Sequence, residues 1–189
     1  AVPRLGREAK RELGIVGLGK MGANIARRLT GRGWDVIGVD KPEVLEKLKS
    51  EGIAGAKSLE DLVKKLASPR IIWLMVPAYA KASAGKPAAS PVDEVIFGEQ
   101  GLLKFLSKGD IIVDGGNSYF ADTVARYKKV TKRGIEFIDV GVSGGPGGAL
   151  AGACIMAGGK ESVFKKIEPL IKDMAREGSY QFFPGGGAG

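Results

Sequence analysis

Short apolar runs alternate with amphipathic segments along most of the chain. The apolar runs predict strands over residues 13–16, 35–39, 71–76, 111–114 and 135–140. The other segments carry apolar residues at helical spacing and predict helices over residues 21–32, 42–51, 58–66, 92–106 and 121–133, with an interruption of the fourth helix at residues 98–101. This alternation predicts an α/β fold with a doubly wound, mostly parallel sheet and helices on both of its faces.

Local signals support several of these elements. The run over residues 71–76 is apolar at every position, which is typical of a parallel strand covered on both faces. Ser58 is expected to cap the helix over residues 58–66, because Asp61 follows three residues later in capping-box position. These signals favour a buried central strand and well-defined helix starts.

The remaining segments complete the pattern. Residues 1–12 are basic and are expected to form a lead-in, so that one domain covers residues 13–189. A mixture of Ala, Ser, Gly and Pro predicts a surface loop over residues 77–91, whose lysines are expected to be solvated rather than to bind phosphate. A second, glycine-rich loop is expected over residues 141–152, followed by a strand over 154–157, a helix over 160–174 and a strand over 180–182.

A glycine-rich turn joins the first predicted strand to the first helix. It contains Gly17, Gly19 and Gly22, spaced as G-x-G-x-x-G. In a dinucleotide-binding turn the first glycine allows the tight bend, the second lets the backbone approach a pyrophosphate and the third lets helix and strand pack closely. Asp40 ends the next strand, about 20 residues further on, where a carboxylate binds ribose hydroxyls. The pattern favours dinucleotide binding over a glycine-rich turn without a ligand.

The other candidate residues also follow strands. In a parallel sheet of this kind, ligands bind outside the carboxyl ends of the strands. The loops after Val16, Val39, Val76, Asp114 and Val140 are therefore expected to converge on one crevice.

Composition narrows the classes of function. The chain has 189 residues, 44% of them hydrophobic, and no apolar run reaches the ~20 residues of a membrane helix. The charged first residues lack the apolar core of a signal peptide, so a cytoplasmic location is expected. A single cysteine excludes an intramolecular disulfide, and the absence of histidine removes the commonest metal ligand and general base, so no metal site is expected.

The net charge of +8 admits two interpretations. Nucleic-acid binding is not expected, because the basic residues are scattered among acidic ones and form no arginine-rich block. A small anionic substrate, or a cofactor that carries a diphosphate, accounts for the positive balance more simply.

Five motifs occur in an order that resembles a known family. They are Gly-Leu-Gly-Lys-Met-Gly-Ala-Asn at 17–24, Met-Val-Pro-Ala at 75–78, Val-Asp-Glu-Val-Ile at 92–96, Asp-Gly-Gly-Asn-Ser at 114–118 and Val-Ser-Gly-Gly at 142–145. Together they resemble the N-terminal domain of the 6-phosphogluconate dehydrogenases, within the β-hydroxyacid dehydrogenase superfamily. The resemblance runs from about Leu13 to the C-terminus and implies a Rossmann-type domain that precedes a helical substrate domain.

The resemblance implies roles for individual residues. Those expected to bind the cofactor are Gly17, Leu18, Gly19, Lys20, Met21, Gly22, Asp40, Lys41, Val76, Pro77, Ala78 and Asn117. Those expected to bind the substrate are Asn117, Ser143, Gly144 and Gly145. Apolar packing accounts for Val76 equally well, and turn statistics alone explain an asparagine after two glycines.

Some positions depart from the family pattern. Asp40 stands where many NADP-using relatives carry an Asn-Arg-Thr segment, which favours NAD over NADP, although Lys41 softens this preference. Pro146 to Ala149 are more like the hydroxyisobutyrate branch, and the segment after Ala78 is longer than usual. The family's catalytic lysine has no counterpart up to Gly189, and Lys160, Lys165 and Lys172 are expected to be solvated. No catalytic residue is therefore expected in this chain.

The resemblance favours one function and leaves two alternatives open. In the whole enzyme, which is expected to be a homo-oligomer, 6-phosphogluconate is oxidised with hydride transfer to NAD and the 3-keto intermediate is decarboxylated. One alternative is a 3-hydroxyisobutyrate-type dehydrogenase. The other is a non-catalytic, NAD-binding regulatory module.

Overall fold

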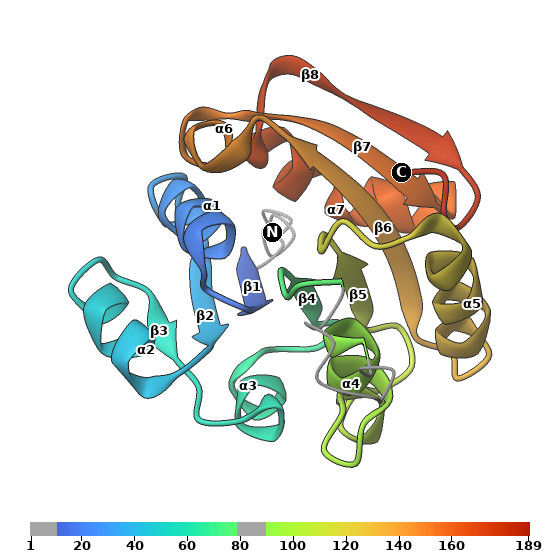
Figure 1. Cartoon of the computed structure of the whole chain (residues 1–189), viewed down its shortest axis with the longest axis horizontal. Coiled ribbons are helices and arrows are strands. Elements are labelled where there is room, and N and C mark those ends of the chain that lie inside the picture. Colours follow the sequence, from blue (N-terminus) through green and yellow to red (C-terminus); the bar gives the residue numbers. More distant parts are fainter. Residues whose placement is uncertain (1–10, 79–89) are drawn as a thin grey trace, which may run out of the picture.

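This computed structural model describes residues 11–78 and 90–189 of the chain, and a single sheet forms the centre of that part (Figure 1). Within that part it has eight strands, in the order β3-β2-β1-β4-β5-β6-β7-β8. The strands are β1 (Glu12–Val16), β2 (Asp35–Val39), β3 (Ala54–Gly55), β4 (Ile71–Leu74), β5 (Ile111–Asp114), β6 (Glu136–Ser143), β7 (Ala153–Gly159) and β8 (Ala175–Pro184). All neighbouring strands are parallel except β6 and β7, which are antiparallel.

Helices cover both faces of this sheet. They are α1 (Lys20–Thr30), α2 (Pro42–Lys49), α3 (Leu59–Lys65), α4 (Pro91–Phe97), α5 (Phe120–Thr131), α6 (Gly145–Ala151) and α7 (Glu161–Met174), with a 3₁₀ turn, η1 (Leu102–Lys104), after α4. Side chains of α1 and α7 pack on one face, and side chains of α3, α4 and α5 pack on the other. The predicted doubly wound α/β fold is thus confirmed.

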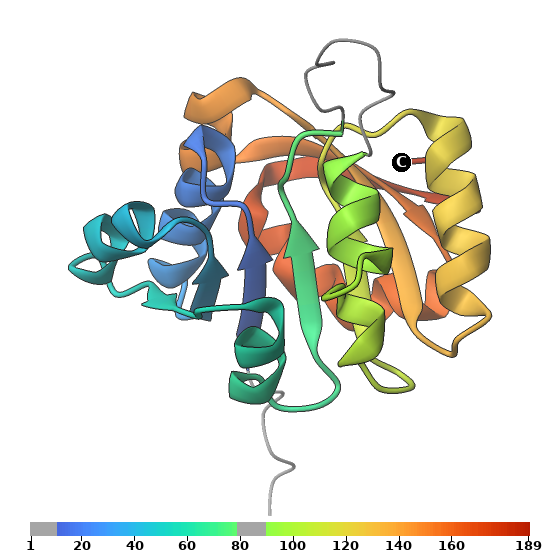
Figure 2. The same ribbon diagram turned by 60° about the horizontal axis from the view of Figure 1, so that its bottom comes forward.

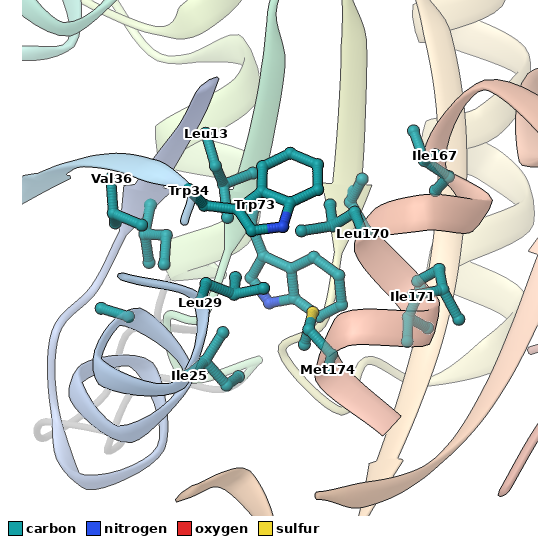
Figure 3. Close-up of a cluster of buried hydrophobic side chains, with 14 of the residues drawn as sticks. Leu13, Ile25, Leu29, Trp34, Val36, Trp73, Ile167, Leu170, Ile171 and Met174 are labelled. Atoms are coloured by element: carbon teal, nitrogen blue, oxygen red, sulfur yellow. The ribbon is translucent and has the colours of Figure 1, made fainter. Parts of the chain in front are cut away.

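The central strand β4 is covered on both faces of the sheet. Ile72, Trp73 and Leu74 are all fully buried, and the alternation of the strand sends Trp73 to one face and its two neighbours to the other. Figure 3 shows Trp73 between Leu29 of α1 and Leu170 and Met174 of α7. The continuous apolar run in the sequence is therefore a consequence of two covered faces.

The glycine-rich segment after β6 differs from its predicted form. A loop was expected over residues 141–152, but β6 continues to Ser143 and α6 occupies Gly145–Ala151. Glycine disfavours helix, yet α6 lies against α1, where Asn24 Nδ2 donates to the Pro146 carbonyl at 2.9 Å. The helical conformation of this glycine-rich segment therefore depends on its packing against α1.

Other differences concern element ends and edges. Strand β4 ends at Leu74 rather than at residue 76. Strand β8 is much longer than expected, and it pairs with β7 at Ala175 and at residues 180–183. The short edge strand β3 was not predicted. The interruption of the fourth predicted helix is confirmed, since α4 ends at Phe97 and η1 follows.

Two predicted segments fall wholly or largely outside the described residues. They are the basic lead-in, of which residues 1–10 are not described, and the loop over residues 77–91, of which residues 79–89 are not described. Lys160, Lys165 and Lys172 lie in the described part and are exposed, as expected. No helix in residues 11–78 and 90–189 is long and apolar enough to cross a membrane.

Candidate dinucleotide-binding site

The candidate site lies where the strand order changes direction. From β1 the chain proceeds outward to β2 and β3, then crosses back to β4 on the other side of β1 and continues to β5 and β6. In Figure 2 the arrows of β1 and β4 point to the same edge of the sheet. The loops that follow β1, β2, β4 and β5 meet there, as the parallel arrangement predicts.

The three glycines of the first loop have different surroundings. Gly17 has φ +94°, its N–H donates to the Val39 carbonyl at 2.9 Å, and a Cβ there would lie 2.7 Å from the Met75 carbonyl oxygen. A Cβ on Gly22 would overlap the Gly17 carbonyl oxygen. A Cβ on Gly19 would meet no atom of residues 11–78 and 90–189 within 4 Å. Two glycines are therefore required by the fold itself, whereas Gly19 borders open space.

That open space adjoins the N-terminus of α1. Gly19 is the N-cap residue, no side chain in the described part of the chain caps the helix there, and the first turn contains no acidic residue. The first backbone N–H groups of a helix have no partner inside it, and the helix dipole adds a partial positive charge. Lys20 is exposed beside them. The arrangement suits a diphosphate group.

Asp40 connects this loop to the end of β2. Its Oδ2 accepts a hydrogen bond from the Leu18 N–H at 2.5 Å, and its Oδ1 accepts one from the Lys41 N–H at 2.7 Å. A carboxylate oxygen can accept a second hydrogen bond, so Asp40 retains capacity for a ligand hydroxyl. Lys41 is exposed as the N-cap residue of α2.

The loop after β4 lies between the loops after β1 and β5. A methyl carbon of Val76 would be 3.2 Å from a Cβ on Gly17, and the Val76 carbonyl oxygen would be 2.6 Å from a Cβ on Gly116. Val76 also packs against the core cluster on the α3, α4 and α5 face. Pro77 is exposed and Ala78 is buried. The structure thus brings the Met75 to Ala78 motif together with both glycine loops.

Asn117 is held in an uncommon backbone conformation after β5. Its φ is +57°, the one positive value among described residues other than glycine. The buried Asp114 holds this turn by accepting hydrogen bonds from the Gly116 N–H at 3.1 Å and the Ser118 hydroxyl at 2.8 Å. Asn117 is exposed and lines a cavity of about 60 Å³. Asparagine tolerates this conformation, so turn geometry and ligand binding are compatible at this position.

Asp139 lines the same cavity from β6. Its carboxylate accepts hydrogen bonds from the N–H groups of Gly187 and Gly189, each at 2.7 Å. Burial raises the pKa of Asp139, and these two backbone donors oppose part of that shift. The carboxylate therefore fixes the last residues of the chain beside the turn that contains Asn117.

The predicted substrate loop follows β6 directly. Ser143, Gly144 and Gly145 are exposed at the junction of β6 and α6, next to α1. Among the described residues, Ser143 and Asn117 form no hydrogen bond with each other. Ser143 thus ends β6 directly before α6, and α6 contacts α1.

The sequence alone does not single out Arg126, although its side chain pairs with both Asp93 and Asp114. It is buried on the inner stripe of α5 together with Thr123 and Val130. The signal available in the sequence was its spacing, since a charged residue falls three residues after and four residues before residues on the buried face.

Comparisons with known proteins agree with this geometry. A family model described as the NAD binding domain of 6-phosphogluconate dehydrogenase matches residues 12–183. The NAD⁺-dependent, decarboxylating 6-phosphogluconate dehydrogenase of Bacillus subtilis is 39% identical over 87% of this chain and 34% of its own length. Its NADP⁺-dependent counterpart from the same organism is 37% identical over 87% of this chain and 33% of its own length. The chain thus spans about a third of each of these curated relatives.

A solved structure of a β-hydroxyacid dehydrogenase other than a 6-phosphogluconate dehydrogenase has the same fold. The 3-hydroxyisobutyrate dehydrogenase of Salmonella typhimurium superposes with a TM-score of 0.79 and 25% identity, covering 94% of this chain and 58% of the other. Both branches of the superfamily therefore share this domain.

Proposed function

Because the chain belongs to the family of NAD binding domains of 6-phosphogluconate dehydrogenase, we propose that it binds NAD for a 6-phosphogluconate dehydrogenase-type oxidoreductase. The observation that carries this proposal is the loop after β1, where Gly17 and Gly22 are fixed by contacts while Gly19 borders open space at an uncapped helix N-terminus. That combination leaves room for a diphosphate and donors to bind it.

The residues around that loop divide the binding task. The N–H groups at the start of α1 and the exposed Lys20 would bind the diphosphate. The carboxylate of Asp40 would accept a hydrogen bond from an adenosine ribose hydroxyl, whereas the 2′-phosphate of NADP would be repelled by it. Both Asp40 oxygens already bond to backbone N–H groups, so the carboxylate is held in place. This favours NAD over NADP.

The other half of the cofactor would lie toward β4 and β5. Val76, Pro77 and Ala78 supply an apolar wall, and Asn117 supplies an amide that can donate and accept hydrogen bonds. Bound there, the nicotinamide supplies a hydride acceptor. Ser143, Gly144 and Gly145 would hold the anionic substrate through the serine hydroxyl and exposed backbone.

The proposed reaction of the whole enzyme is the oxidative decarboxylation of 6-phosphogluconate to ribulose 5-phosphate. The family's acid/base lysine has no counterpart among these 189 residues, so this chain alone would bind the cofactor and turn over little substrate. A cytoplasmic location and a homo-oligomeric full-length enzyme are part of the same proposal, supported by the family resemblance.

A second candidate is a 3-hydroxyisobutyrate-type dehydrogenase. It is favoured by Pro146 to Ala149, which lie in α6, and by the fold similarity to the Salmonella enzyme. Assaying a full-length protein with 6-phosphogluconate and with 3-hydroxyisobutyrate distinguishes the two, since a higher kcat/KM for the latter would overturn the first proposal.

Cofactor binding is tested on the 189-residue chain by calorimetric titration. NADH is expected to bind at least about tenfold more tightly than NADPH, because a desolvated like-charge contact costs more than 1.4 kcal/mol. Tighter binding of NADPH would contradict the role proposed for Asp40, and failure to bind either nucleotide would overturn the proposal. Binding of NADH with no dehydrogenase activity in a full-length protein would instead support a regulatory module.

A further inference from the structure

A buried arginine on α5 connects two of the loops at the candidate site. The Arg126 side chain is 3% exposed. Its Nε donates to Asp93 Oδ1 at 2.8 Å, and its Nη2 donates to the Ser90 hydroxyl oxygen at 3.0 Å. Its Nη1 lies 3.5 Å from Asp114 Oδ2. One guanidinium group therefore contacts residues before α4, within α4 and at the end of β5.

Each of these contacts leads to a loop of the site. On one side, Asp114 accepts the hydrogen bonds from Gly116 and Ser118 that shape the turn around Asn117. On the other side, the Ser90 hydroxyl donates to the Ala78 carbonyl oxygen at 2.8 Å. Arg126 thus holds the end of the Val76 to Ala78 segment and the turn of Asn117 relative to each other.

The charge of Arg126 persists despite its burial. Burial lowers the pKa of the guanidinium. The hydrogen bond to Asp93 and the charges of Asp93, Asp114 and Asp122 raise this pKa by more, so the net shift is upward. The planar guanidinium donates to Asp93 and Ser90 at once and keeps its charge 3.5 Å from Asp114, which a lysine ammonium on a flexible stem cannot do with the same geometry. The site is therefore specific for arginine rather than for positive charge alone.

We infer that Arg126 is a positioning residue for the nicotinamide half of the cofactor site, acting through Asp114 on the Asn117 turn and through Ser90 on Ala78. The inference rests on the proposed function, because it takes these two loops to be the nicotinamide wall. It concerns only this half of the site, since the hydrogen-bond and ion-pair partners of Arg126 among the described residues do not include the glycine loop after β1 or Asp40.

The test compares two ligands on the same chain. Calorimetry measures the dissociation constants of NADH and of ADP-ribose, which lacks the nicotinamide, for wild type and for Arg126→Lys. Arg126→Lys is expected to weaken NADH about tenfold, the equivalent of one charge-assisted hydrogen bond, while ADP-ribose changes less than about twofold. Arg133→Lys makes the same chemical change at an exposed position just after α5 and is expected to alter neither constant.

The outcomes separate this inference from the proposed function. Equal weakening of both ligands, or of neither, overturns the positioning role of Arg126. Absence of binding of both ligands to the wild type overturns the proposed function itself. Ser90→Ala provides a second variant without a change of charge, and it is expected to weaken NADH about threefold in a chain whose circular dichroism matches the wild type. Unchanged NADH binding by Ser90→Ala also contradicts the inference.

Discussion

At the residue scale, the three glycines of the G-x-G-x-x-G motif are subject to different physical constraints. Gly17 has a positive φ, which favours glycine. A Cβ on either Gly17 or Gly22 would also come too close to a backbone carbonyl oxygen. Gly19 has φ −64°, which any residue can adopt, and a Cβ there would meet no atom of the described residues within 4 Å. No contact in the described part of the chain requires glycine at that position, whereas a ligand bound beside it would.

This difference predicts opposite outcomes for two similar substitutions. Gly19→Ala is expected to change the free energy of unfolding by less than about 1 kcal/mol, because its surroundings are open. The same variant should weaken NADH binding about tenfold or more, since the methyl group would occupy space needed for the diphosphate. Chemical denaturation and calorimetry measure the two quantities.

Gly22→Ala is the matched control. Its methyl group would overlap the Gly17 carbonyl oxygen, so we expect a loss of about 1–3 kcal/mol of stability from forced backbone movement. If Gly19→Ala binds NADH as tightly as the wild type, the space beside Gly19 is not the diphosphate site.

Asp139 predicts a pH dependence with a definite sign. Because burial raises its pKa in the folded state, the folded protein binds this proton more tightly than the unfolded chain does. The resulting stabilisation is present below the ordinary aspartate pKa of about 4 and is lost as the pH rises through the raised value. The difference in unfolding free energy between wild type and Asp139→Asn should therefore fall as the pH rises across this range.

Asp61 supplies a control of opposite sign. The Lys57 N–H and the Lys65 ammonium lower its pKa, so its stabilisation is present above the ordinary value and is lost as the pH falls through the lowered one. The difference between wild type and Asp61→Asn should rise with pH. A flat profile for Asp139→Asn would show that its proton is not coupled to folding.

At the scale of elements, sequence patterns predicted what neighbours along the chain determine. Ser58 caps α3 as expected, because its hydroxyl oxygen accepts from the Asp61 N–H at 3.1 Å, three residues away. The loop after β1 was equally accessible to prediction, since a strand, a glycine turn and a helix N-terminus lie within one short segment. Such features depend on spacing and propensity alone.

Contacts between distant segments could not be predicted in this way. The glycines of α6 indicated a loop, and only its packing on α1 makes the segment helical. Arg126 and Asp93 are 33 positions apart in the sequence, so no local pattern links them. The fold and the glycine loop were thus foreseeable, whereas the network that connects the loops after β4 and β5 required the structure.

Arg28 shows how one side chain fixes the relative placement of elements. From α1, its Nε donates to the Asp173 carbonyl at 2.7 Å and its Nη2 to the Ala175 carbonyl at 2.8 Å, at the C-terminal end of α7. Arg28→Ala is expected to lower the free energy of unfolding by about 2 kcal/mol, because two partly buried carbonyls lose charged donors. Urea denaturation measures this change.

The adjacent Arg27 is the control for that substitution. It pairs with Glu51 on the surface, where solvent and salt screen the interaction. Arg27→Ala should therefore cost less than about 1 kcal/mol. An equal cost for both arginines would contradict the structural role assigned to Arg28.

At the scale of the whole molecule, the sheet joins all the elements into one body. The strands of the described part form a single sheet with apolar clusters on both faces. The candidate site lies at the carboxyl ends of the strands, where the strand order changes direction between β1 and β4. The loops after β1 and β2 come from one side of this point and those after β4 and β5 from the other, so a ligand bound there would hold the two sides of the sheet together.

Ligand binding is therefore expected to stabilise the entire fold. NADH at 100 times its dissociation constant should add about 2.7 kcal/mol to the free energy of unfolding. For a domain of this size that corresponds to a rise of about 5–10 °C in Tm, measured by circular dichroism. Gly19→Ala at the same NADH concentration should show a smaller rise. A Tm that does not respond to NADH would exclude tight binding to the folded state.

Trp73 gives the molecule an optical property that follows from its place in the sheet. Its buried indole nitrogen lies directly below the turn after β5, 2.6 Å from where a Cβ on Gly115 would be. Indole emission overlaps the absorption of reduced nicotinamide, so a dihydronicotinamide bound above this turn would quench Trp73 by energy transfer. The other tryptophan, Trp34, directly precedes β2 and lies in the same buried cluster as Trp73 (Figure 3). In a Trp34→Phe variant, the remaining fluorescence would report cofactor occupancy from within the core.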